Sequence, residues 1–247
     1  MSETLDTIVA VLRKANRAVA FTGAGISTDS GIPDFRSPGG VWSRYKPVMY
    51  QEFLASHEAR ARYWAMKKEA FRDFADAQPN VAHRALAKLE QDGKLRGVIT
   101  QNIDGLHQDA GSRVVLELHG TNREAYCLDC EKRVSAERVQ EHLEAGEDVP
   151  KCEACGGWMK PATVSFGQDL PADVLSEAQR LSAESDFYLA IGSSLVVQPA
   201  AGLPVFAKSR GAFLVILNRD ETPLDGIADA VVRESAGETL ARIVAEL

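Results

Sequence analysis

The sequence lacks a long hydrophobic run and an excess of basic residues. The longest apolar run near its C-terminal end, residues 212–217, is far too short to cross a bilayer. The formal net charge of the 247 residues is −7, so the chain as a whole has no electrostatic footprint for nucleic acid, although a local basic groove stays open. We therefore expect neither a membrane nor a nucleic acid as a partner.

We also expect no secretory signal in the first residues. Residues 1–14 alternate charged residues with Leu5, Ile8, Val9 and Leu12, a spacing that predicts an amphipathic helix rather than the apolar centre of a signal peptide. We therefore expect a cytoplasmic protein. In that compartment the four cysteines are better explained as metal ligands than as disulfides.

Two catalytic signatures are incomplete or absent. The sequence has no Gly-x-Ser-x-Gly, so a serine hydrolase would lack its nucleophile turn. Gly23-Ala24-Gly25 follows an apolar run and could bind phosphate, but Thr28 stands where the dinucleotide fingerprint has its third glycine. The region 40–47 contains no acid to hold a ribose. An ordinary dehydrogenase is therefore disfavoured, and a tight connection without a ligand stays open.

Short apolar runs alternate with helical patterns along the chain, and the apolar content of 45% supports a real core. This alternation predicts a doubly wound, Rossmann-like parallel sheet of the α/β class, with helices on both faces. A helix capped by Asn80 and ended by Gly93 is part of the pattern. The predicted strands are 18–22, 96–100, 114–118, 186–191 and 212–217, with a short extended piece at 163–166, and the predicted helices include 51–77, 171–181, 199–210 and 238–247.

The four cysteines form two Cys-x-x-Cys pairs within a stretch that is rich in charge and poor in aliphatic residues. Cys127 and Cys130 are separated from Cys152 and Cys155 by 21 residues, close to the spacing of a zinc ribbon. Four thiolates complete a tetrahedron and leave no position for an activated water. The pattern predicts one structural zinc ion; a redox pair or unlinked thiols are the alternatives.

Polar clusters follow the predicted strands, and His119 is one of them. In an open parallel sheet the carboxyl ends of the strands line one crevice, so these clusters should converge in space. His119 is the best placed of the five histidines to act there as a base, and the other four are better explained as packed or solvated. The clusters are 23–25, 101–104, 119, 192–194 and 218.

Taken in order, these motifs resemble those of the sirtuins, the NAD-dependent protein deacylases. The resemblance covers nearly the whole chain and implies that NAD is consumed as a reactant. Nicotinamide would leave, the acyl oxygen of an acyl-lysine would attack the exposed ribose carbon, and His119 would act as general base on a ribose hydroxyl. The products would be nicotinamide, O-acyl-ADP-ribose and free lysine. The motifs are Gly23-Ala24-Gly25-Ile26-Ser27, Gly31-Ile32-Pro33-Asp34-Phe35-Arg36, Thr100-Gln101-Asn102-Ile103-Asp104, His119-Gly120, the cysteine pairs and Gly192-Ser193-Ser194-Leu195-Val196-Val197.

The same resemblance implies the site residues and the division of the chain. The catalytic residues would be His119 and Asn102. Residues meeting NAD would be Ala24, Gly25 and Thr28 at the phosphates, Phe35 and Arg36 at the ribose and nicotinamide, Gln101, Asn102, Ile103 and Asp104 in the nicotinamide pocket, and Gly192, Ser193, Ser194, Asn218 and Ala236 at the adenosine half. The NAD-binding domain would comprise 1–36, 79–120 and 162–247, with a loop and helical insert at 37–78 and the zinc-ribbon insert at 121–161.

The peptide site implied by the resemblance is Val164-Ser165-Phe166-Gly167, which would pair with an extended acyl-lysine peptide through main-chain hydrogen bonds. Sirtuins that favour acidic acyl groups carry Tyr-x-x-Arg in the helical insert. Here Tyr63 is followed three residues later by Met66. We therefore expect a neutral acyl group. Mono-ADP-ribosyl transfer to protein, or a non-catalytic NAD-sensing module with a zinc ribbon, are the alternative functions.

Overall fold

The computed structural model describes residues 3–33 and 46–247. The predicted site residues Phe35 and Arg36, and residues 37–45 of the predicted loop and helical insert, lie outside the described residues. The helices and strands in chain order are α1 (Glu3–Lys14), β1 (Ala18–Thr22), η1 (Ala24–Ile26), η2 (Thr28–Ser30), α3 (Tyr50–Ala55), α4 (His57–Ala75), α5 (Val81–Gln91), β2 (Leu95–Thr100), α6 (Leu106–Asp109), β3 (Val115–Glu117), β4 (Gly120–Cys127), β5 (Arg133–Ser135), α7 (Ala136–Glu144), β6 (Met159–Thr163), α8 (Ala172–Glu184), β7 (Phe187–Ile191), α9 (Gly202–Ser209), β8 (Phe213–Leu217), η3 (Asp225–Ile227), β9 (Ala230–Val232) and α10 (Ala236–Glu246).

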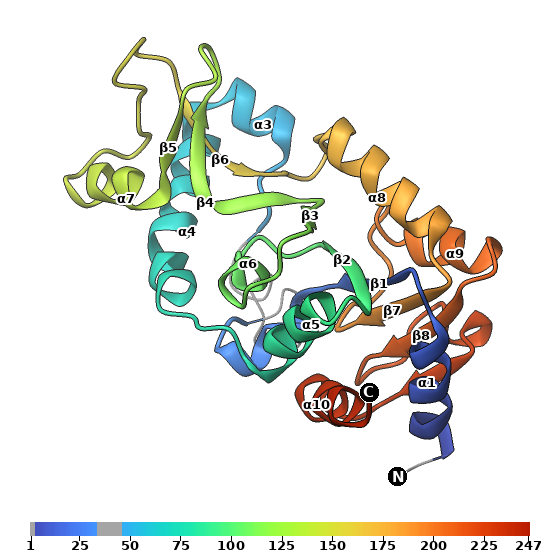
Figure 1. The fold of residues 1–247 in the computed structure, drawn as a ribbon. Coiled ribbons are helices and arrows are strands. Elements are labelled where there is room, and N and C mark those ends of the chain that lie inside the picture. Colours follow the sequence, from blue (N-terminus) through green and yellow to red (C-terminus); the bar gives the residue numbers. More distant parts are fainter. Residues whose placement is uncertain (1–2, 34–45) are drawn as a thin grey trace.

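The large sheet has the strand order β3-β2-β1-β7-β8-β9, and every pairing in it is parallel. This is the doubly wound order in which the chain turns back at the first strand, so the predicted fold class is confirmed. Figure 1 shows the sheet with α1, α5 and α10 toward one face and α8 and α9 toward the other. Because the order reverses between β1 and β7, the carboxyl ends of these two strands border the crevice in which such sheets bind ligands.

The central strand β1 is buried on both faces, and its residues alternate between two apolar cores. Ala18 and Ala20 pack in the cluster that includes α1, α5 and α10, whereas Val19 and Phe21 pack in the cluster that includes α8 and α9. Each helix contributes one apolar stripe, such as Leu5, Ile8, Val9 and Leu12 of α1. This two-sided burial explains why the strands read as continuous apolar runs in the sequence.

A second, antiparallel sheet of order β5-β4-β6 lies beside the large one and joins α7, α4 and α3 in a small module (Figure 1). Its core is a cluster of eight buried residues that includes two of the cysteines. The sequence predicted an insert here but not β4, β5 or α7.

Three predicted elements differ from those observed. The helical stretch at 51–77 is two helices, because Ser56 is extended and its side chain caps α4 by accepting a hydrogen bond from the Ala59 amide at 3.3 Å. Only Thr163 of the extended piece predicted at 163–166 belongs to a strand, the end of β6, which lies earlier in the chain. The helix predicted at 199–210 begins only at Gly202. None of the helices in residues 3–33 and 46–247 has the length and apolar character that a membrane span requires.

Candidate active site

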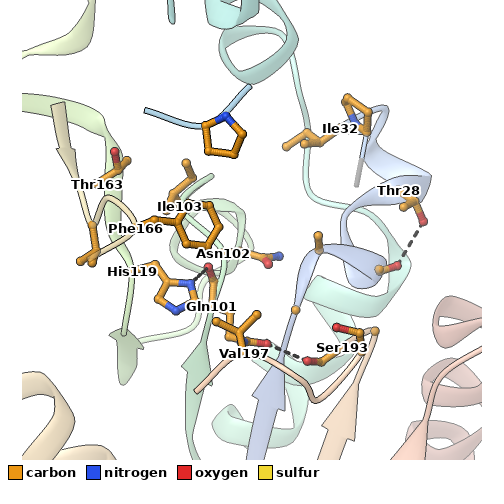
Figure 2. Close-up of a pocket in the computed structure, with 18 of the residues that line it drawn as sticks. Thr28, Ile32, Gln101, Asn102, Ile103, His119, Thr163, Phe166, Ser193 and Val197 are labelled. Carbon is orange, nitrogen blue, oxygen red and sulfur yellow. Dashed lines mark hydrogen bonds between the residues drawn. The ribbon is translucent and has the colours of Figure 1, made fainter. Parts of the chain in front are cut away.

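One cavity of about 860 Å³ lies at the carboxyl edge of the large sheet and reaches the small module. Figure 2 shows His119 on one side of it and Thr28 on the other, with Asn102 between them and Gln101 joined to Ser193. The polar clusters that the sequence predicts to converge therefore do so. The predicted site residues that line it are Ala24, Gly25, Thr28, Gln101, Asn102, Ile103, His119, Val164, Ser165, Phe166, Gly167, Gly192, Ser193, Ser194, Asn218 and Ala236.

The glycine turn after β1 is pressed against the turn after β7. The Gly25 amide donates to the Gly192 carbonyl at 2.8 Å, and a Cβ placed on Gly25 would lie 2.7 Å from the Gly192 Cα. Gly192 itself has a φ of +59°, where glycine is favoured. The amides of Gly23, Gly25, Ile26 and Ser27 all donate within the protein. These glycines therefore allow the two turns to meet, and they shape the cavity wall rather than offering those four amides to a phosphate.

Asn102 is the centre of a buried hydrogen-bond network below the cavity. Its side-chain amide donates to the Ser27 hydroxyl at 3.0 Å, and that hydroxyl donates to the Asp104 carboxylate at 2.7 Å. Asp104 also accepts from the Leu106 amide and, among the described residues, is not part of the cavity lining. The structure thus places Asp104 behind Ser27, so its effect on the cavity passes through Ser27 and Asn102. No role for Ser27 follows from the sequence, because only the fold brings it to Asn102.

His119 lies between β3 and β4 and lines the cavity (Figure 2). Its Nδ1 is 2.9 Å from the carbonyl oxygen of Gln101, which can only accept, so Nδ1 carries the proton of the neutral ring. The Nε2 atom is then the basic nitrogen. The Gln101 side chain is held by the Ser193 hydroxyl, which donates to it at 2.7 Å. The arrangement provides an oriented base beside both turns of the crevice.

His83 and His107 are packed, as the sequence predicts, and form a buried pair with ring centroids 4.9 Å apart. The Thr22 hydroxyl donates to Thr100 at 2.8 Å, so the 2.9 Å contact of Thr22 with His107 has Nε2 as its donor. Burial lowers the pKa of His107 to about 3 and that of His83 to about 4. Both rings are therefore neutral at physiological pH, and the His83 Nε2 lies 3.4 Å from the Ser27 hydroxyl of the network below the cavity.

The segment after β6 forms the opposite wall. The Val164 amide donates to the His119 carbonyl at 2.8 Å, and the Phe166 carbonyl accepts from the Tyr50 amide at 2.9 Å. The Ser165 amide donates to the Gln168 side chain at 3.1 Å. Several main-chain groups of the segment expected to pair with a peptide are thus used within the protein, and pairing through this segment stays a prediction.

At the far end of the cavity, Asn218 is fixed by main-chain contacts. Its side-chain amide donates to the Asp220 carbonyl at 2.9 Å, and its own carbonyl accepts from Arg233 at 3.0 Å. Ala236, the first residue of α10, lines the same end. This end also carries acidic residues and one arginine, which sequence reasoning missed because they lie in loops without a recognisable motif: Asp29, Arg219, Asp220, Glu221 and Glu234.

The four cysteines meet at one point of the small module. The Cys127 and Cys155 sulfurs are 3.5 Å apart, those of Cys130 and Cys152 are 3.7 Å apart, and all four lie within 4.8 Å of one another. Tetrahedral zinc with bonds of about 2.3 Å requires sulfurs separated by about 3.8 Å. The donor set and its spacing fit one zinc ion, and since all four positions are protein ligands the ion is structural.

Comparison with known proteins was consistent across sequence and structure. Residues 23–199 match the Sir2 family. The chain is 47% identical to an NAD-dependent protein deacetylase of Thermodesulfovibrio yellowstonii over 98% of this chain and 94% of that protein. It is 48% identical to an NAD-dependent protein deacetylase of Rhodopseudomonas palustris, over 99% of this chain and 97% of that protein.

A solved Sir2 complex with deacetylated p53 peptide and 3′-O-acetyl-ADP-ribose superposes with a TM-score of 0.93, at 43% identity and 98% coverage of both chains. A Sir2 complex with p53 peptide and NAD superposes with a TM-score of 0.91, at 43% identity and the same coverage. With a family match over more than half its length and relatives this similar across almost all of it, the chain belongs to the Sir2 family, the sirtuins.

Proposed function

We propose that this protein is an NAD-dependent protein-lysine deacetylase. The observation that carries the proposal is the position of His119, which lines a cavity that joins the Gly23–Gly25 turn on one side to the segment 163–167 on the other. A base at that junction can serve a reaction between a dinucleotide and an extended peptide. The relatives named NAD-dependent protein deacetylase, and the Sir2 complexes with peptide, NAD and acetyl-ADP-ribose, support it.

The reaction consumes NAD as a substrate. One NAD, one acetyl-lysine and one water give nicotinamide, O-acetyl-ADP-ribose and lysine, and the positive charge of the nicotinamide ring ends on the lysine ammonium. The bond between ribose and nicotinamide breaks, the acetyl oxygen bonds to the ribose carbon, and the amide bond to lysine is lost. His119 takes the proton of a ribose hydroxyl at Nε2, because the Gln101 carbonyl keeps the proton of the ring on Nδ1.

The other predicted site residues bind and orient the substrates. We assign Gln101, Asn102 and Ile103 to the nicotinamide pocket, with Asp104 holding Asn102 through Ser27. Ala24, Gly25 and Thr28 would face the phosphates, and Gly192, Ser193, Ser194, Asn218 and Ala236 the adenosine half. All of these except Asp104 and Ser27 line the cavity. Val164–Gly167 would bind the peptide, and the preferred acyl group would be neutral.

The formal charge of −7 supports a protein substrate rather than nucleic acid, and we propose that the protein acts in the cytoplasm without a membrane partner.

Product analysis tests the proposal. The protein is incubated with NAD and an acetyl-lysine peptide, and the products are identified by mass spectrometry. We expect equal amounts of nicotinamide, O-acetyl-ADP-ribose and unmodified lysine peptide, with nicotinamide release that depends on the acetylated peptide. ADP-ribose attached to protein, with the acetyl group retained on the lysine, would instead establish ADP-ribosyl transfer. A protein that binds NAD and leaves both substrates intact would be a non-catalytic NAD sensor.

A further inference from the structure

The loop between β2 and α6, residues 101–105 (the pocket loop), contains the residues that we assign to the nicotinamide pocket. Hydrogen bonds tie its main chain to the start of β4, which leads into the small module. The His119 Nδ1 donates to the Gln101 carbonyl at 2.9 Å, and the Asn122 amide donates to the Ile103 carbonyl at 2.8 Å. Figure 2 shows the first of these contacts at the cavity. Because the pocket loop orients His119, a shift of the loop would move the base as well.

The side chain of Arg123 in β4 makes a further contact with the pocket loop. Its Nε and Nη2 donate to the Asp104 carbonyl at 3.2 and 3.1 Å. The same guanidinium bonds to both oxygens of the Asp109 carboxylate, with Nη1 at 2.9 Å from the first of them. Such a two-pronged contact with a carboxylate fixes the plane of a guanidinium. Asp109 therefore aims Arg123 at the end of the pocket loop.

Gly105 shows that this contact depends on a close fit. Its φ of +72° lies in the left-handed region that favours glycine. A Cβ on Gly105 would collide with the Arg123 guanidinium, whose Nε, Cζ and Nη2 would be its nearest neighbours. The missing side chain at this position thus lets the guanidinium lie directly against the backbone of the loop.

Strand β4 is a firm support for these contacts, because α4 is bonded both to it and to its neighbour β6. Lys67 donates to the Asn122 side-chain oxygen at 2.7 Å, and the Trp64 indole donates to the Met159 carbonyl at 3.2 Å. The start of β4 is therefore fixed from the small module, and the pocket loop of the large sheet is held against it.

Arg123 can act on the cavity only through the loop. Its side chain is 46% exposed and is not among the described residues that line the cavity. The residue that it holds, Asp104, accepts the Ser27 hydroxyl at 2.7 Å, and that hydroxyl accepts from the Asn102 side chain at 3.0 Å. A displacement of about 1 Å from a productive geometry can cost about a hundredfold in rate. Release of the Asp104 carbonyl would thus disturb Asn102.

We propose that Arg123 is a positioning residue, which fixes the Asp104 carbonyl and thereby sets how strongly the pocket loop holds nicotinamide and how it orients His119. The inference rests on the proposed deacetylase function and deepens it. It gives a residue outside the cavity control over the nicotinamide end of NAD and over inhibition by the nicotinamide that the reaction releases.

The kinetic test compares the wild type with Arg123→Met and Arg123→Lys. In Arg123→Met we expect kcat/KM for NAD to fall about tenfold, and the nicotinamide concentration that halves the rate to rise about tenfold, as for loss of a charged hydrogen bond. The KM for the acetyl-lysine peptide should stay unchanged. Arg123→Lys should recover part of both losses, because an ammonium can bond to the Asp104 carbonyl but cannot bridge it to Asp109 with a planar fork.

Two more variants separate positioning from a general effect of charge. Asp109→Asn keeps an acceptor and removes the charge that aims the guanidinium, so it should cause the same pattern to a smaller extent. Arg133→Met is the matched control. Arg133 lies in β5 of the same small sheet, its side chain is 61% exposed, and it is paired with Glu124 at 2.8 Å. Its replacement should leave the rate and the nicotinamide inhibition at their wild-type values.

Binding without turnover separates this inference from the proposed function. Calorimetric titration with NAD and with ADP-ribose, in the presence of a peptide with unmodified lysine, compares ligands with and without nicotinamide. Arg123→Met should lower NAD affinity relative to ADP-ribose affinity, with zinc content and melting temperature confirming that it is folded. If this variant does not fold, Arg123→Lys and Asp109→Asn provide the same comparison.

The two hypotheses fail in different ways. A wild-type protein inactive on acetyl-lysine peptide would refute the deacetylase function, and the ratio of NAD to ADP-ribose affinity would still test Arg123. A folded Arg123→Met protein with the wild-type ratio and the wild-type nicotinamide inhibition would overturn the inference. Equal losses of NAD and ADP-ribose affinity would also overturn it, because they would show a general effect on the fold.

Discussion

The buried histidine pair makes the stability of this protein depend on pH in a calculable way. His107 has a pKa of about 3 in the folded protein, because its ring is buried against His83, and an ordinary pKa of 6.5 when exposed. Above pH 6.5 the ring is neutral in both states, and its full contribution to stability is present. As the pH falls below 6.5, the unfolded chain takes up a proton that the folded protein does not. The free energy of unfolding therefore decreases down to the folded pKa.

The magnitude follows from the unfolded state alone while the pH stays well above 3. One pH unit corresponds to about 1.4 kcal/mol, so at pH 5.5 His107 should have lowered the free energy of unfolding by about 1.4 kcal/mol relative to pH 8. His83, with a folded pKa of about 4, should add a similar loss.

The assay is urea denaturation followed by circular dichroism at pH 8 and pH 5.5, for the wild type and His107→Gln. The glutamine keeps a donor toward Thr22, the partner that His107 contacts at 2.9 Å, and removes the titration. The decrease between the two pH values should be about 1.4 kcal/mol smaller in the variant. Proton-coupled loss of zinc affects both proteins and cancels. His57→Gln, which removes a histidine with a 52% exposed side chain, should keep the wild-type decrease. An equal decrease in His107→Gln and the wild type would refute the reasoning.

Two further predictions concern the zinc cluster and the glycine turn after β1. Metal analysis should find about one zinc ion per chain. Removal of zinc with a strong chelator should change the fluorescence of Trp64 and Trp158, since both pack in the cluster around the cysteines. A zinc-free protein that stays folded and active would contradict a structural role of the ion. Gly25→Ala should weaken ADP-ribose binding at least about tenfold and destabilise the fold by about 1–3 kcal/mol, because its Cβ would lie 2.7 Å from the backbone of Gly192. Gly226→Ala is the control, because its added Cβ would meet no atom within 4 Å. If calorimetric titration found the same ADP-ribose affinity in Gly25→Ala and the wild type, the close approach of the Gly25 and Gly192 turns would not be required for binding.

The large sheet could be predicted because burial on both faces leaves a direct mark on the sequence. The strand 18–22 is apolar throughout, and its five residues are all buried. The strand β4 carries no such mark: six of its eight residues are partly or fully exposed, and it is held by pairing with β6 and by the cysteine cluster rather than by an apolar face of its own. Contacts between distant segments, which periodicity does not register, specify this part of the fold.

The candidate site also has a part that could be predicted from the sequence and a part that could not. The position of His119 and the polar clusters at strand ends follow from topology, because parallel strands bring their carboxyl ends to one edge. The direction of a side chain within such a cluster does not follow. Asp104 was expected in the nicotinamide pocket and lies behind Ser27. Lys67 stands in an ordinary helical stretch and reaches the cavity only because α4 packs beside β4 and β6.

The central claim is that His119 acts as the base in a cavity shared by the dinucleotide turns and the peptide segment. The most direct measurement is the rate of O-acetyl-ADP-ribose formation from NAD, with and without acetyl-lysine peptide, in the wild type and His119→Ala. We predict peptide-dependent formation of O-acetyl-ADP-ribose in the wild type and its loss in the variant, with zinc content and melting temperature unchanged. Formation of O-acetyl-ADP-ribose at the wild-type rate by a folded His119→Ala protein would contradict the account.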